Sequence, residues 1–140
     1  MSRPDSGTRT IETVRDVHNS FGVPVIAANG IAGAAALLAW WVPRLRGRWV
    51  WALTIVAEAA LALQVVLGVV LVASDRYTVA RFHMFYGFVG FLTIGLAYQY
   101  RDNFRRDEET PRWRSVELFY GIVGLFLMGV AIRAVIRVTT

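Results

Sequence analysis

Hydrophobic residues fall into four long runs that are separated by short polar segments. The runs cover residues 19–42, 49–73, 81–100 and 115–136. Each contains about the 20 residues that a helix needs to cross a bilayer. Because the connections between them are short, consecutive runs are expected to lie antiparallel. The pattern predicts an all-α integral membrane protein that forms an up-down-up-down four-helix bundle with short connections.

The N-terminal part of the chain is polar. Residues 1–10 are small and polar, and we expect them to be poorly ordered. Apolar residues at helical spacing from Thr10 onward predict a short amphipathic piece on the membrane interface, after which the chain turns inward. Pro24 is then expected within the first turn of the crossing helix, where its missing N–H costs little. We therefore divide the chain into an interfacial segment, 1–18, and one four-span membrane domain, 19–140, whose first run is not a cleavable signal peptide.

The four runs share an internal repeat. A pentad made of a polar residue, two further residues, a large apolar residue and a glycine occurs in each run. The pentads begin at His18, Gln64, His83 and Glu117 and end at Gly22, Gly68, Gly87 and Gly121. The third and fourth runs agree most closely, since a shift of 34 positions superimposes seven identical residues. We interpret the chain as four copies of one membrane-spanning element.

Glycines three residues apart form a groove on each of the last two runs. The pairs are Gly87 with Gly90 and Gly121 with Gly124. Close approach at small residues drives the association of helices in lipid. Our first interpretation is therefore a small, non-catalytic accessory subunit that packs through these grooves against other membrane subunits or a second copy, with the charged loop 101–114 as the contact outside the lipid. Alternatively, the glycines only allow contacts between helices of the same chain.

Two histidines are expected at the same depth near one membrane surface. His18 and His83 stand at the start of runs that enter from the same side. Gln64 and Arg133 return to that level on the other two runs. In a four-membered bundle the first and third helices are diagonal, about 11–14 Å apart. This gap is wide enough for a flat macrocycle with one imidazole on each face.

Our second interpretation is that such a macrocycle binds between the two histidines, and neighbouring residues favour it. Gly22 and Gly87 lie one turn deeper than the histidines and leave space beside such a plane. Arg133 is placed to bind a propionate of haem b. The arrangement is similar in a general way to that of bis-histidine membrane cytochromes, a resemblance that implies a haem b-binding electron carrier.

The same residues also allow a structural interpretation. His18 can be an interfacial residue outside the hydrocarbon, and His83 can hydrogen-bond a backbone carbonyl across a helix contact. Gln64 and Glu117 begin the same pentad without being ordinary haem ligands, so the pentad can be a packing device. Two histidines without nearby carboxylates do not make up the ligand set of a closed zinc or copper site.

One carboxyl group is expected near the middle of the bilayer. Glu58 lies about nine residues into the second run, and Asn29, about ten residues into the first, comes to a comparable depth. Antiparallel neighbours can place Asn29 against Glu58, whose carboxyl we expect to be protonated because hydrocarbon disfavours charge. A third interpretation is therefore a small proton- or cation-coupled transporter that uses Glu58. Alternatively, this carboxyl is neutral and structural.

Composition supports the membrane class. Hydrophobic residues make up 56% of the chain, and its mean hydropathy is positive. The net charge of +5 comes from arginines in the polar segments, so it indicates membrane topology and no nucleic-acid partner. Arginine is concentrated in loops 43–48 and 101–114, which we therefore place in the cytoplasm, with the protein in the plasma membrane.

Catalytic and redox-active residue sets are missing from the sequence. Cysteine is absent, which removes disulfides, thiolate metal sites and thiol nucleophiles. No phosphate loop, nucleophile elbow, HExxH motif or pair of catalytic carboxylates occurs. We therefore expect a protein that is not an enzyme.

Overall fold

Four α-helices make up almost all of the chain that the structure describes. The computed structural model describes residues 5–75, 77, 79–104 and 115–136. The helices are α1 (Ser6–Trp41), α2 (Arg48–Ala73), α3 (Arg81–Tyr100) and α4 (Val116–Ile136), with short 3-10 turns η1 (Pro43–Leu45) and η2 (Arg101–Phe104). The predicted all-α class is confirmed, and the predicted limits of the last three helices agree with the structure to within one residue.

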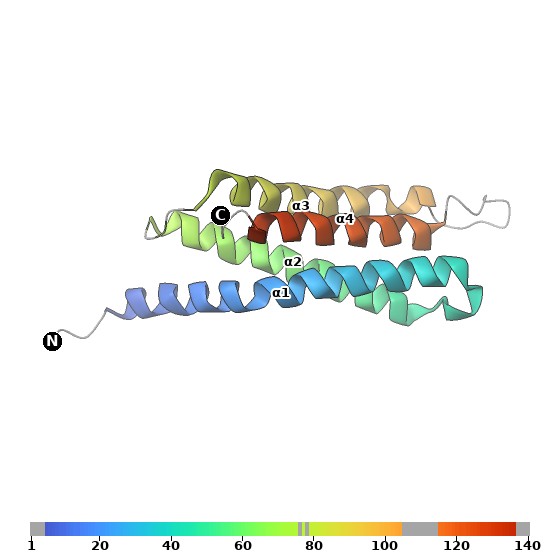
Figure 1. Cartoon of the computed structure of the whole chain (residues 1–140), viewed down its shortest axis with the longest axis horizontal. Coiled ribbons are helices and arrows are strands. Elements are labelled where there is room, and N and C mark those ends of the chain that lie inside the picture. The colour runs from blue at the N-terminus through green and yellow to red at the C-terminus, as the bar shows by residue number, and fades with distance from the viewer. Residues whose placement is uncertain (1–4, 76, 78, 105–114, 137–140) are drawn as a thin grey trace.

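The helices lie side by side and alternate in direction (Figure 1). α1 packs against α2 and α4, and α3 packs against the same two helices. α1 and α3 therefore occupy diagonal positions. Short connections between consecutive helices enforce this arrangement, because each helix must turn back along its predecessor.

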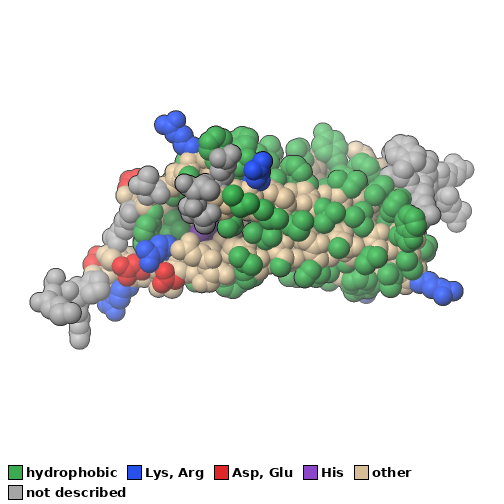
Figure 2. Space-filling view, viewed as in Figure 1, with side chains coloured by type: hydrophobic (Ala, Val, Ile, Leu, Met, Phe, Trp, Pro, Cys, Tyr) green, Lys and Arg blue, Asp and Glu red, His purple; other side chains and the backbone are tan. Residues whose placement is uncertain are grey.

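Three helices are long and apolar enough to cross a membrane, among the residues that the structure describes. They are α1, α2 and α4. α3 has the length of a span, but tyrosine, glycine, histidine and glutamine lower its hydropathy, so three of the four predicted spans have both the length and the hydropathy of a crossing helix. Hydrophobic side chains cover the middle of the molecule, arginines lie toward both of its ends, and acidic side chains are seen at the end of the N-terminus (Figure 2). These features are those of a small membrane protein.

α1 differs from its prediction. It is one continuous helix of 36 residues that starts at Ser6, without a turn between an interfacial piece and a span. The expected first-turn position of Pro24 is wrong, because Pro24 lies inside the helix. The carbonyl of Asp5 accepts hydrogen bonds from the Thr8 and Arg9 amides and so begins the helix. Once nucleated, a helix extends at one hydrogen bond per added residue, which carries α1 through its polar part.

Glycines bring α1 and α4 into backbone contact. A Cβ atom added at Gly124 would lie 2.7 Å from the Cα of Gly33, and one added at Gly33 would lie 2.8 Å from the amide nitrogen of Leu125. A Cβ added at Gly121 would lie 2.6 Å from the side chain of Leu37 in α1. The glycine groove expected on the fourth run is therefore occupied by α1 of the same chain.

The glycine pair of α3 also faces neighbours in the chain. A Cβ at Gly90, which is buried, would lie 3.6 Å from Leu61 and 3.7 Å from Val130. One at Gly87 would lie 4.0 Å from Val65. This pair therefore allows α3 to approach α2 and α4, a looser contact than the one between α1 and α4.

Candidate functional site

The two histidines meet between the diagonal helices. The ring centroids of His18, on α1, and His83, on α3, are 5.8 Å apart, and the ring planes are 76° apart. Both residues are half-buried. The structure thus places at one level the two imidazoles for which the sequence predicted a common depth.

A backbone carbonyl orients the ring of His83. Its Nδ1 lies 3.2 Å from the carbonyl oxygen of Ala134, in the last turn of α4. A carbonyl can only accept, so Nδ1 carries a proton, and in the neutral ring Nε2 then has the lone pair. The last four carbonyls of a helix have no partner within it, which leaves the oxygen of Ala134 free to accept. The bond predicted by the structural interpretation is therefore present, and it also leaves Nε2 available as a ligand.

The ring of His18 is held less completely. Its Nδ1 is buried and has no hydrogen-bond partner in the described part of the chain. The backbone is fixed instead, because the Gln64 side-chain amide donates to the carbonyl oxygen of His18 at 2.6 Å. Gln64 is thus a tie between α1 and α2 at the level of the histidines.

Gly68 touches the His18 ring, a contact that the sequence analysis missed. A Cβ at Gly68 would lie 3.2 Å from Cε1 of His18. Gly22, for which space beside a macrocycle was predicted, instead faces Gln64 and Val135 at 4.0 Å. The only sequence signal for Gly68 was its place at the end of the α2 pentad.

Arg133 is exposed and directly precedes Ala134, which puts it at the histidine end of α4. No group of three or more histidine, cysteine, aspartate or glutamate side chains that could hold a metal ion is found among the described residues. The histidine pair therefore lacks the further protein ligands of a closed tetrahedral site.

A second polar cluster lies deeper in the bundle. Glu58 is 3% exposed, and neither carboxyl oxygen has a hydrogen-bond partner among the described residues. The Tyr98 hydroxyl of α3 lies close to this carboxyl. Asn29, 1% exposed, donates from Nδ2 to the carbonyl oxygens of Val25 at 2.9 Å and of Ala57 at 3.2 Å. Asn29 was predicted to lie against Glu58. Its hydrogen bond to α2 goes to the carbonyl of Ala57, the residue before Glu58.

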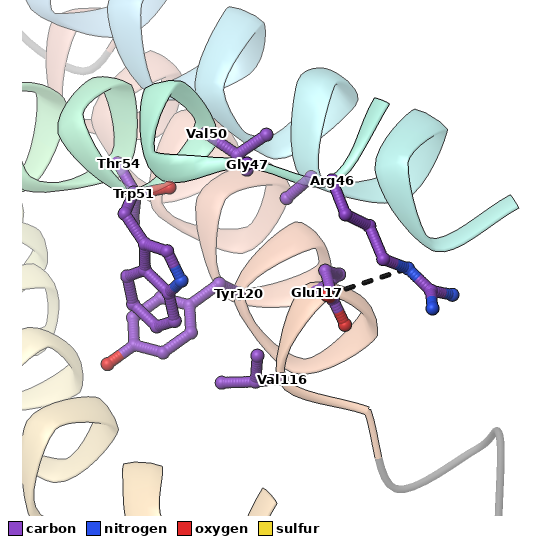
Figure 3. A pocket seen from close by; sticks show the side chains of 9 residues that line it. Arg46, Gly47, Val50, Trp51, Thr54, Val116, Glu117 and Tyr120 are labelled. Carbon is purple, nitrogen blue, oxygen red and sulfur yellow. Dashed lines mark ion pairs between the residues drawn. The ribbon is translucent and has the colours of Figure 1, made fainter. Parts of the chain in front are cut away.

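A pocket of about 320 Å³ opens at the opposite end from the histidines (Figure 3). Its lining residues are Ala36, Arg46, Gly47, Val50, Trp51, Thr54, Val116, Glu117 and Tyr120. Nε of Arg46 lies 3.6 Å from Oε1 of Glu117 and also donates to the carbonyl oxygen of Ala39 at 3.0 Å. This arginine therefore closes the C-terminus of α1 and ties it to the start of α4.

The charged loop proposed as a partner contact, 101–114, is described only up to Phe104, since residues 105–114 lie outside the described residues. Comparison with protein-family models, curated proteins and solved structures gives no match for this chain.

Proposed function

We propose that the protein is a small membrane electron carrier that binds haem b between His18 and His83. The observation that carries this proposal is the distance of 5.8 Å between the two ring centroids. Two imidazoles on opposite faces of one iron have centroids about 6 Å apart, because imidazole–metal bonds are about 2.0–2.1 Å long. The observed distance is close to that separation.

The hydrogen bond of the His83 ring and the unpaired nitrogen of the His18 ring support this assignment. Histidines that bind metals usually donate their other ring N–H to a carbonyl or carboxylate. The Nδ1 of His83 makes such a bond to Ala134. The buried Nδ1 of His18 has no protein partner within the described residues, and an unsatisfied buried polar atom costs about 1–3 kcal/mol. A ligand or ordered water that pairs with this ring would recover that cost.

The surroundings of the pair suit a flat ligand. Gly22, Gly68 and Gly87, from three different helices, supply no side chains at or next to this level. Arg81 and Arg133 are exposed at the same end of the molecule and are the candidates to bind the two propionates. With a histidine on each face, the iron would have no open position for a substrate, which favours electron transfer over catalysis.

We infer that all four helices cross the membrane, including α3. Exposed apolar side chains follow its outer surface at Phe82, Phe85, Phe88, Phe91, Leu92 and Leu96. Its histidine instead points toward α4. A helix with an apolar outer face and inward polar groups suits lipid better than its average hydropathy suggests. We place this four-span bundle in the plasma membrane, with loops 43–48 and 101–114 in the cytoplasm.

The accessory-subunit interpretation takes second place because its grooves are filled. Gly121 and Gly124 pack against α1, so they are not open to a partner. Gly95 and Gly129, which occupy equivalent places in the repeat, have nothing within 4 Å of an added Cβ. These two open glycines favour association with a second membrane protein, which an electron carrier also requires.

The absorption spectrum of the purified protein tests haem binding. The protein is expressed in cells supplied with haem and purified in a mild detergent. We expect a Soret band and, after reduction with dithionite, the sharp visible bands of six-coordinate haem b. A colourless preparation of folded protein would refute the proposal.

Variants test the assignment of the ligands. His83→Gly and His18→Gly should each lose the six-coordinate spectrum, and added imidazole should restore it by occupying the vacated position. Glu117→Gln, at the opposite end of α4, is the matched control and should keep the wild-type spectrum. A wild-type spectrum in either histidine variant would show that this histidine is not a ligand.

A further inference from the structure

We propose that Glu58 is a proton-exchange site inside the bundle, reached by water from the end that carries Arg46 and Glu117. The site is distinct from the histidine pair and does not depend on haem. Its ligand is a proton. The neutral carboxyl gives this proton to a water molecule in the pocket, which carries it out as a hydronium ion, and a hydronium ion that arrives by the same route returns a proton to the carboxylate. In each direction one O–H bond breaks as another forms.

The first step is the isolation of the carboxyl group. Glu58 is almost fully buried and forms no ion pair in the described part of the chain. A charged carboxylate without a partner is very costly in such surroundings, so the resting state is the neutral acid. Both oxygens lack hydrogen bonds to described residues, and so does Oδ1 of Asn29. A carboxyl with a purely structural role would be expected to form hydrogen bonds with both oxygens.

The second step is access from one end. Thr54 lies one helical turn before Glu58 on the same face of α2, and Thr54 lines the pocket. Tyr120 also lines the pocket and lies within electrostatic range of Glu58. In Figure 3 the side chain of Thr54 lies at one end of the pocket and the Arg46–Glu117 ion pair at the other. The walls of the pocket thus lead from the charged end toward the carboxyl.

The third step is closure toward the histidines. Leu61 is buried and lies on α2 between Glu58 and Gln64. It packs in one cluster with Val25 of α1 and Leu127 of α4, and Leu127 is fully buried. This apolar layer excludes water, so Glu58 exchanges protons with one side only.

Every helix contributes a group near the carboxyl. The groups are Asn29 from α1, Thr54 from α2, Tyr98 from α3 and Tyr120 from α4, with Arg46 and Glu117 at the mouth and Arg101 beside Tyr98. Those nearest Glu58 are neutral. Exchange is therefore governed by the entry of water rather than by a fixed charge.

Infrared spectroscopy of the purified full-length protein tests the proposal. A protonated carboxyl gives a C=O band that shifts when its proton is replaced by deuterium. The difference between the infrared spectra of the wild type and Glu58→Gln should contain this band, and transfer of the wild type into D₂O should shift it. A missing band, or a band that does not shift in D₂O, would overturn the proposal.

A pocket-filling variant tests the route. Val116→Trp places a large side chain in the pocket and should slow the exchange about tenfold, which corresponds to about 1.4 kcal/mol on the barrier to water entry. Val66→Trp, on the exposed outer surface of α2, is the control and should exchange at the wild-type rate. If circular dichroism shows that Val116→Trp does not fold, Thr54→Val replaces it.

Equal exchange rates in the pocket variant and the control would refute entry through the pocket. Because the infrared band requires no pigment, these outcomes are independent of the haem spectrum. Haem binding and proton exchange can therefore fail separately.

Discussion

Within the part of the chain that the structure describes, backbone carbonyl groups and a missing side chain position the two histidines. His83 bonds the Ala134 carbonyl, and the carbonyl of His18 accepts from Gln64. On the other side of the His18 ring, Gly68 provides the space that the imidazole occupies. The position of this ring therefore depends on one absent Cβ atom.

Replacing Gly68 by valine tests this dependence. The new side chain would meet Cε1 of His18, whose ring would have to rotate away from His83. Changes that disturb the orientation of a ligand typically cost about 10- to 100-fold in affinity for the bound group. We expect a loss of haem affinity in this range, measured by titrating the haem-free protein with haemin.

The control is Gly95→Val, further along α3, where an added Cβ has nothing within 4 Å. This variant should bind haem as the wild type does. Equal affinities for Gly68→Val and Gly95→Val would show that the contact with Gly68 does not position His18.

The sequence predicted the depth of the polar residues but not their individual contacts. The rise per residue of a helix was enough to place His18, Gln64 and His83 at one level. It could not give the rotation of each helix about its axis, which decides that Gly68 and not Gly22 faces the His18 ring. A bond from His83 to a backbone carbonyl was one of the predicted alternatives, but the sequence did not identify Ala134 as the acceptor.

At the level of elements, the helices were predicted more accurately than their packing. The apolar runs located α2, α3 and α4, whereas α1 continues through a polar stretch where no change in hydrophobicity marks its start. The glycine pairs correctly signalled close approach. They did not indicate which helix fills each groove, because a small residue carries no information about its partner.

Replacing Gly124 by valine tests the contact between α1 and α4. An added Cβ would lie 2.7 Å from the Cα and 2.9 Å from the amide nitrogen of Gly33. These are backbone atoms that cannot rotate away, so the helices must separate. We expect the free energy of unfolding in detergent to fall by about 3 kcal/mol, measured by denaturant titration.

Gly129→Ala, at a glycine further along the same helix, provides the comparison. Nothing lies within 4 Å of a Cβ at this position, so the free energy of unfolding should change by less than about 1 kcal/mol. If both variants unfold at the same denaturant concentration, the contact of Gly124 with Gly33 does not hold the bundle together.

At the level of the whole molecule, the polar groups are arranged in layers along the helices. The histidine pair lies near one end, the apolar layer of Leu61 and Leu127 follows, Glu58 comes next, and the pocket reaches the other end. The two proposed sites are thus separated by a layer of packed apolar side chains. This order gives the molecule a distinct function at each end only if the helices stand across a membrane.

The two proposals at this scale depend on whether α3 crosses the membrane. Because the chain contains no cysteine, single cysteine variants can be labelled to measure this. Single variants Ala80→Cys and Asp102→Cys flank α3, and Leu45→Cys lies between α1 and α2 at an exposed position. If α3 crosses, an impermeant maleimide should label Ala80→Cys in intact cells, and label the other two variants only after permeabilisation. Equal labelling of Ala80→Cys and Asp102→Cys from one side would mean that α3 lies on the surface. His83 could then not meet His18 inside a bundle that spans the lipid, and the haem proposal would fail with the four-span topology.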